Sequence, residues 1–219
     1  MVAKIVVLLL TKGRVPYTLR AIHSIEANLR YDNFSYYVAD GGSLPEEHKQ
    51  VIALLEDYGA EWRGHSQVAS SGENWNRGIS EIFKDMSQHI YLRLENDFEL
   101  AEPLDPTPYV DLLNDLPNVG CIRLGLLPIK LDIHTMGYDG RIYQHIRKST
   151  QYVWSGNPCL VHRRFHDYYG MFRHGLTPGD SELSLDDKVR RKDGPYVWRP
   201  NALGDYGPFR HIGEEQSAF

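Results

Sequence analysis

The feature that most constrains the fold is an unbroken apolar run at residues 5–10, Ile-Val-Val-Leu-Leu-Leu, close to the start of the chain. A strand with one face in water alternates apolar and polar residues, whereas a continuous apolar run is typical of a strand covered on both faces. The run is too short for a signal-peptide core or a membrane span. It therefore predicts a central strand of a parallel sheet.

The segments that follow alternate between strand-like and helix-like patterns. Further strands are predicted over Phe34–Ala39, near Glu61–His65 and over His89–Leu94. Helical stripes of apolar residues lie between them, and their starts are predicted at Pro16 and at two capping-box pairs, Ser43 with Glu46 and Ser70 with Glu73. This order predicts an α/β fold, a Rossmann-like domain with a mostly parallel central sheet and right-handed crossovers.

The second half of the chain is less regular. It predicts a strand over residues 118–125, a hairpin or loop over 137–155, a short strand over 157–161 and a polar helix over 181–192. The last twenty residues carry Gly and Pro with no period. No linker interrupts the chain, so we expect one domain over residues 1–219, with a ligand-binding half at 1–99 and a second half at 100–219.

Composition excludes some functions. The 219 residues carry a formal net charge of −5, which argues against tight non-specific binding to DNA or RNA but leaves room for a small basic groove. The two cysteines, Cys121 and Cys159, lie in apolar stretches and are interpreted as small buried side chains in a reducing compartment. We therefore expect a cytoplasmic protein without a structural zinc site.

Acidic residues follow the predicted fourth strand. Glu95 and Asp97, two residues apart, point to the same side of a strand end, where ligands of parallel sheets bind. Two close carboxylates repel each other unless a cation lies beside them, and a divalent metal that holds a diphosphate is a natural partner. The alternative is a solvated strand end, which the continued alternation at Glu99 supports.

A second motif, Asp40-Gly41-Gly42-Ser43, ends the predicted second strand. The glycines allow a ligand to approach the backbone closely, and the Asp40 carboxylate could accept a hydrogen bond from a nucleobase. The alternative is a simple turn between strand and helix.

The chain resembles the inverting family-two glycosyltransferases of the GT-A fold over nearly its whole length. The resemblance rests on the order of several short motifs: Thr11-Lys12-Gly13-Arg14, Asp40-Gly41-Gly42-Ser43, Asn76-Arg77-Gly78, Glu95-Asn96-Asp97, Gly156-Asn157, Arg163-Arg164-Phe165, Gly170-Met171-Phe172 and Gly179-Asp180-Ser181-Glu182-Leu183. The chain departs from the family pattern in three of its segments. Glu95 replaces an Asp, Asn74-Trp75 replaces Ala-Arg, and Gly179 replaces an acid.

The resemblance implies an enzyme that moves a sugar from a nucleotide diphosphate sugar, with a uridine diphosphate sugar as the first expectation, to an acceptor hydroxyl with inversion. Mn²⁺ or Mg²⁺ would assist the reaction. The residues expected to contact the donor are Thr11, Arg14, Asp40, Asn74, Asn76 and Glu95. Asp97 would bind the metal, and His211, in the aperiodic tail, would be a late metal ligand on a mobile lid; the alternative for His211 is a surface residue of a frayed terminus.

The resemblance also implies the catalytic carboxylate. Asp180 would accept the proton of the attacking hydroxyl, and Glu182 could bond an acceptor hydroxyl. From the residues alone, Pro178-Gly179-Asp180-Ser181 is equally a turn and helix cap. Asn157 would belong to the acceptor side, and Tyr152 and Trp154 could stack on a sugar, although core packing is the expectation for at least one of the two rings.

Two other functions remain open. A nucleotidyltransferase of related fold would need a glycine-rich phosphate loop, and Thr11-Lys12-Gly13-Arg14 has the basic residues but only one Gly. A non-catalytic carbohydrate-binding protein on the same scaffold is disfavoured by the acidic residues. The acceptor itself, whether a glycan, a lipid-linked sugar, a protein or a modified nucleobase, has no readable signature.

Overall fold

The computed structural model describes residues 3–125, 133–146, 153–203 and 207–213. Its first half alternates strands and helices as predicted. The elements are β1 (Ile5–Thr11), α1 (Val15–Asn28), β2 (Phe34–Asp40), α2 (Pro45–Asp57), β3 (Trp62–Ser66), α3 (Ser71–Phe83) and β4 (Ile90–Glu95). The four strands are mutually parallel in the order β3-β2-β1-β4, which confirms the predicted sheet.

The second half extends this sheet and adds a small one. Its elements are β5 (Phe98–Leu100), α4 (Thr107–Asp115), β6 (Val119–Arg123), β7 (Ile133–Tyr138), β8 (Arg141–Ile146), β9 (Cys159–His162), α5 (Arg163–Tyr169), α6 (Pro178–Arg191), β10 (Tyr196–Pro200), the 3₁₀ turn η1 (Asn201–Leu203) and β11 (Phe209–His211). Among the described residues the main sheet runs β3-β2-β1-β4-β9-β6-β10-β8-β7. β9 is antiparallel to both of its neighbours, so it joins the two halves through one continuous sheet.

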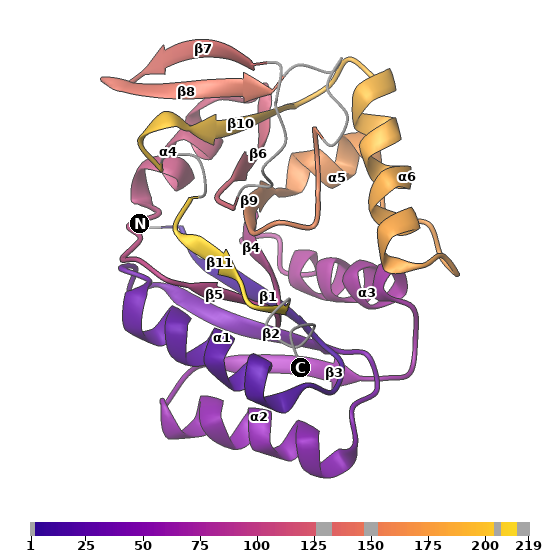
Figure 1. The fold of residues 1–219 in the computed structure, drawn as a ribbon. Coiled ribbons are helices and arrows are strands. Elements are labelled where there is room, and N and C mark those ends of the chain that lie inside the picture. Colours follow the sequence, from indigo (N-terminus) through magenta and orange to yellow (C-terminus); the bar gives the residue numbers. More distant parts are fainter. Residues whose placement is uncertain (1–2, 126–132, 147–152, 204–206, 214–219) are drawn as a thin grey trace.

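Helices cover both faces of the sheet, which explains the apolar run. Ile5, Val7 and Leu9 pack into a core with side chains of α1, α2 and α4. Val6 and Leu8, on the other face, join a second core with α3, α5 and α6. Figure 1 shows α1 and α2 on one side of the strands and α3, α5 and α6 on the other. Both faces of β1 are therefore buried over residues 5–9, which is why this part of the strand is entirely apolar.

One of the two predicted capping boxes is confirmed and the other is shifted. The Glu73 N–H donates to Ser70 Oγ at 3.4 Å, and the Ser70 N–H donates to Glu73 Oε2 at 2.9 Å. The start of α2 lies one residue later than predicted, because Pro45 fixes its first turn and the Leu44 N–H donates to Glu47 Oε2 at 2.8 Å. Ser43 therefore does not cap α2; its N–H and hydroxyl donate to the Asp40 carboxylate instead.

The tail is more regular than its sequence predicts. The last twenty residues show no period in the sequence, yet they contain a strand: β11 pairs antiparallel with β5, with His211 opposite Phe98. β10, beside β6, was also not predicted, nor was α4. β5 and β11 have three residues each, too few to show a period, and their pairing joins distant parts of the chain.

Other expectations in the second half hold in whole or in part. A hairpin is present as β7 and β8, but it spans residues 133–146 and not 137–155. Its turn lies where predicted, and in it Asp139 and Gly140 both have positive φ, 45° and 70°. Cys121 and Cys159 are free and buried, as predicted. In the described part of the chain, every helix is too short or too polar to cross a bilayer.

Candidate active site

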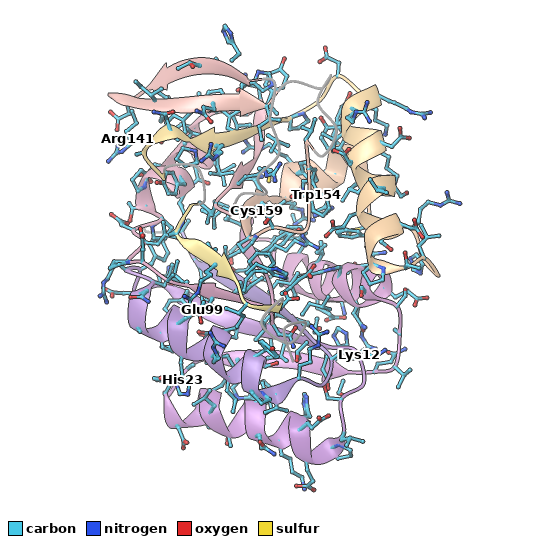
Figure 2. All side chains as sticks on the ribbon, viewed as in Figure 1. Lys12, His23, Glu99, Arg141, Trp154 and Cys159 are labelled. Atoms are coloured by element: carbon cyan, nitrogen blue, oxygen red, sulfur yellow. The ribbon has the colours of Figure 1, made fainter. Side chains whose placement is uncertain are left out.

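A cavity of about 430 Å³ opens at the carboxyl ends of the parallel strands. This is where ligands bind in open α/β sheets. Its lining comes from the ends of β1, β2 and β4, the start of α3 and the segment leading into α6: Leu10, Thr11, Lys12, Arg14, Gly41, Ala69, Ser70, Ser71, Asn74, Glu95, Asn96, Leu176 and Pro178. Figure 2 labels Lys12 at this end of the sheet. Four predicted donor residues, Thr11, Arg14, Asn74 and Glu95, are therefore brought together.

The loop after β1 is held in a tight conformation. The hydroxyls of Thr11 and Thr18 lie 2.9 Å apart, and Asn96 Nδ2 donates to Thr18 Oγ1 at 3.1 Å. Arg14 has left-handed backbone angles, φ 50° and ψ 43°, which cost a non-glycine residue about 1 kcal/mol. Its half-exposed guanidinium reaches 3.9 Å from Asp97 Oδ2. The loop thus presents two cationic side chains, Lys12 and Arg14, to the cavity.

Asp40 is fully buried beneath the cavity instead of lining it. Its Oδ1 accepts from the Ser43 N–H at 3.0 Å and the Ser43 hydroxyl at 2.6 Å, and its Oδ2 accepts from the Ser66 hydroxyl at 2.6 Å. Burial alone would raise the pKa of Asp40, but the hydrogen bonds from Ser43 and Ser66, with His48 nearby, lower it below its ordinary value. The carboxylate shapes the loop, and its neighbour Gly41 forms the cavity wall.

The two predicted asparagines on α3 have different surroundings. Asn74 lines the cavity; its Nδ2 donates to the Ala69 carbonyl at 3.3 Å, and its Oδ1 lies 3.2 Å from His65 Nε2. Asn76 lies outside the cavity lining. Its Nδ2 donates to the Phe172 carbonyl at 2.9 Å and its Oδ1 accepts from the Phe172 N–H at 2.9 Å. Asn76 therefore joins α3 to the segment that follows α5.

Glu95 has a cationic partner that the sequence did not reveal. Arg93, two residues earlier on β4, donates from Nη2 to Glu95 Oε1 at 2.8 Å. The same nitrogen lies 3.5 Å from Glu182 Oε1 on α6. Burial raises the pKa of Glu95 to about 7; Glu182 and Asp97 add to the rise, and Arg93 opposes it. The only signal for it in the sequence is a single arginine in the apolar stretch Ile90–Leu94 that precedes Glu95.

Asp97 and His211, the two residues expected to bind the metal, lie side by side although they are far apart in the chain. The pairing of β11 with β5 brings His211 Nε2 to 3.4 Å from Asp97 Oδ2. The imidazole packs on Phe98, with ring centroids 4.8 Å apart. A Cβ atom added to Gly213 would lie 3.0 Å from both Asp97 Oδ2 and His211 Nε2, so the backbone passes closely over the pair.

The Asp97–His211 pair fits a divalent metal. Asp97 Oδ1 is buried and has no hydrogen-bond partner among the described residues, an arrangement that a cation would satisfy. Carboxylate and imidazole together suit Mn²⁺. Within the described ranges no cluster of three or more His, Cys, Asp and Glu side chains could hold a metal on its own. The remaining ligands would therefore come from a bound phosphate and water.

The two predicted catalytic carboxylates lie in the first turns of α6. Thr177 is the helix cap, not Asp180: the Asp180 N–H donates to Thr177 Oγ1 at 3.2 Å, and the Thr177 hydroxyl donates to Asp180 Oδ2 at 2.7 Å. The Asp180 side chain is exposed. Glu182 is directed inward toward Arg93. Pro178, at the start of the same helix, lines the cavity, whereas Asp180 and Glu182 do not.

The acceptor residues predicted from the sequence are buried. Trp154 has 0% exposed surface and packs against Phe165 and Phe172, so it is a core residue and not a surface for stacking a sugar. This agrees with the alternative of core packing. Asn157 is also buried, and its Nδ2 donates to Ser155 Oγ at 2.8 Å. Tyr152 lies outside the described residues.

No protein-family model and no curated protein sequence matches the chain. Solved structures do. S. aureus TarS (residues 1–349) in complex with UDP-GlcNAc has a TM-score of 0.67 at 12% identity, covering 99% of this chain and 61% of that one. The mannosyltransferase PcManGT from Pyrobaculum calidifontis, in complex with GDP-Man and Mn²⁺, has a TM-score of 0.63 at 14% identity, covering 89% and 53%. GalNAc-T7 with UDP, GalNAc and Mn²⁺ has a TM-score of 0.65 at 12% identity, covering 91% and 42%.

The chain spans less than two thirds of each of these neighbours, and at such low identity the likeness concerns the fold. All three alignments cover most of this chain, including both halves of its sheet. The chain therefore has the fold of the GT-A glycosyltransferases.

Proposed function

We propose that the chain is a glycosyltransferase that moves a sugar from a nucleotide diphosphate sugar to an acceptor hydroxyl with inversion. The observation that carries the proposal is the meeting of Asp97 and His211 beside the cavity at the strand ends. The neighbours that share the fold support it, since their structures contain GDP-Man, UDP-GlcNAc or UDP.

The donor would lie in the 430 Å³ cavity. Lys12 and Arg14, on the loop after β1, supply positive charge for the diphosphate, and Glu95 and Asn74 supply polar contacts to the nucleoside. Two of the three neighbours described above hold uridine nucleotides, so a UDP-sugar is the first candidate. Asp40 and Asn76 would act indirectly, by shaping the walls, because their side chains are occupied by protein partners.

Asp97 and His211 would hold Mn²⁺ or Mg²⁺, with His211 favouring Mn²⁺ because imidazole is a poor ligand for magnesium. A divalent cation bound there supplies neutralisation of the diphosphate leaving group. In this proposal the pairing of β11 with β5 delivers His211, so a strand does what the sequence assigned to a mobile lid.

Asp180 would be the base. The Thr177 hydroxyl orients its carboxylate, and the exposed position lets an acceptor reach it. As the acceptor oxygen attacks the anomeric carbon, its proton passes to Asp180 and the nucleoside diphosphate departs with the electron pair of the broken C–O bond. One displacement inverts the anomeric centre.

The acceptor class stays open among a glycan, a lipid-linked sugar, a protein and a modified nucleobase. Free buried cysteines agree with the cytoplasmic location expected from the sequence.

A thermal-shift screen of nucleotide sugars, with and without Mn²⁺, tests the proposal. A ligand at about 100 times its Kd stabilises a protein by about 2.7 kcal/mol, which raises the Tm of a chain of this size by roughly 5–10 °C. We expect a shift only when Mn²⁺ and one nucleotide sugar are both present, and expect it to be lost in Asp97→Ala and reduced in His211→Ala. Asp111→Ala, an exposed carboxylate on α4, is the matched control. Equal shifts in all variants would contradict the proposed metal site.

A further inference from the structure

Arg93 is a fully buried cation at the end of β4, with 1% of its surface exposed. Three aromatic rings surround its guanidinium: the ring centroids of Trp75, Trp154 and Phe172 lie 4.5, 4.8 and 5.9 Å from its central carbon. Its Nη1 donates to the Ser155 carbonyl at 3.2 Å. A charge placed so deeply is costly unless carboxylates lie against it.

Two carboxylates do so, and they belong to different elements, β4 and α6. Glu95, at 2.8 Å, lines the donor cavity, whereas Glu182, at 3.5 Å, belongs to α6 and lies two residues after Asp180. Burial opposes the charged guanidinium, but Glu95 and Glu182 outweigh it and raise the pKa of Arg93, so it stays a cation. One buried charge therefore connects the cavity to the helix that carries the proposed base.

The approach of Glu182 depends on a glycine. A Cβ atom added to Gly156 would lie 1.7 Å from Glu182 Oε1 and 3.2 Å from Arg93 Nη1. A side chain at this position would occupy the place of the Glu182 carboxylate, and the flexible end of Glu182 would have to move away. The glycine thus leaves room for the carboxylate beside the guanidinium.

We propose that Arg93 is a positioning residue: through Glu182, in the space left by Gly156, it fixes the first turns of α6 relative to the donor cavity. This inference rests on the proposed function. A buried ion pair stabilises a fold little more than apolar side chains of the same volume do, so stability alone does not explain it. Its geometric effect is to fix the distance between Asp180 and the bound donor.

The test uses Gly156→Ala, because removing Arg93 itself would leave two unpaired carboxylates and endanger the fold. Gly137→Ala is the matched control, since a Cβ there meets nothing within 4 Å and the residue lies in the distant β7 strand. The probe is hydrolysis of a nucleotide sugar, taken from the thermal-shift screen, in saturating Mn²⁺ without acceptor. Glu182→Gln and the double variant Gly156→Ala/Glu182→Gln complete the set.

We expect kcat of Gly156→Ala to fall about tenfold or more while KM for the donor stays within about threefold, because Glu95 keeps its bond to Arg93. Glu182→Gln should show the same fall in kcat. The double variant should be no slower than the slower single variant, since both changes break the same contact, that of Glu182 with Arg93. Should Gly156→Ala not fold, the kcat and KM of Glu182→Gln decide the matter.

An unchanged kcat in the folded variants, or a loss confined to KM, would overturn the positioning role and leave the proposed function standing. A merely structural role would lower stability and leave both kinetic constants unchanged. Absence of hydrolysis by the unmodified protein with every nucleotide sugar would overturn the proposed function, and the inference with it.

Discussion

Replacing Asp40 with Asn should destabilise the fold by about 2–4 kcal/mol at neutral pH. The buried carboxylate accepts three hydrogen bonds, two from Ser43 and one from Ser66. An Asn side chain keeps one acceptor oxygen and turns an NH₂ group toward a donor, so at least one bond to a charged group is lost. Such bonds contribute about 1.5–3 kcal/mol each, and a hydroxyl that rotates to accept recovers part of the loss.

The pH dependence of this difference has a definite sign. The pKa of Asp40 is lower in the folded protein than its ordinary value, because the hydrogen bonds outweigh burial. Its contribution to stability is therefore complete above the unfolded-state pKa, about 3.9, and is lost as the pH falls through the lower pKa of the folded state. Asp40→Asn cannot titrate at this position, so the gap in unfolding free energy between the two proteins should narrow as the pH falls from 5 to 3.5.

Urea unfolding followed by circular dichroism, at pH 7, 5 and 3.5, measures these differences. Ser66→Ala is a useful companion, since it removes a single donor to Asp40 and should cost less than Asp40→Asn. Equal stability of Asp40→Asn and the unmodified protein at pH 7, or a gap that widens as the pH falls from 5 to 3.5, would refute the structural role assigned to this carboxylate.

Two further predictions concern α3 and α6. Gly78→Ala should destabilise the protein by about 1–3 kcal/mol in urea unfolding, because its Cβ would lie 2.6 Å from Leu8 Cδ1 in the core, whereas the open position Gly137→Ala should change stability by no more than about 0.5 kcal/mol. Asp180→Asn should bind the donor with unchanged affinity in calorimetry. It should transfer or hydrolyse the donor sugar about 10²–10⁴ times more slowly, since an amide cannot take the proton. Weaker donor binding with normal turnover would show that Asp180 only supports the Thr177 cap of α6.

The parallel half of the fold could be predicted because its signals are local. The apolar run of β1, the capping box at Ser70 and the helical stripes each lie within a few residues, and the structure confirms them. The start of α2 was displaced by one residue because Pro45 outweighs Ser43 as a helix-start signal. Strand ends then placed Thr11 and Glu95 at one cavity without further information.

The parts that were missed depend on contacts between distant residues. β5 and β11 are each too short to show a pattern and exist because they pair with each other. Arg93 was included in a strand as one polar residue, and only the folded chain shows its aromatic surroundings and two carboxylates. Trp154 was assigned to an acceptor surface because composition cannot separate an aromatic that stacks on sugar from one that fills a core.

The most direct test of the account is whether the protein releases nucleoside diphosphate from a nucleotide sugar. The reactions contain Mn²⁺, and the products are measured by chromatography. The unmodified protein should release nucleoside diphosphate and free sugar slowly without acceptor, and Asp97→Ala or a chelator should abolish the release. Pyrophosphate formed from a nucleoside triphosphate and a sugar phosphate would instead indicate a nucleotidyltransferase. Sugar binding without any release would indicate a carbohydrate-binding protein, and release that is unchanged in Asp97→Ala with chelator present would contradict the proposed metal-assisted transfer.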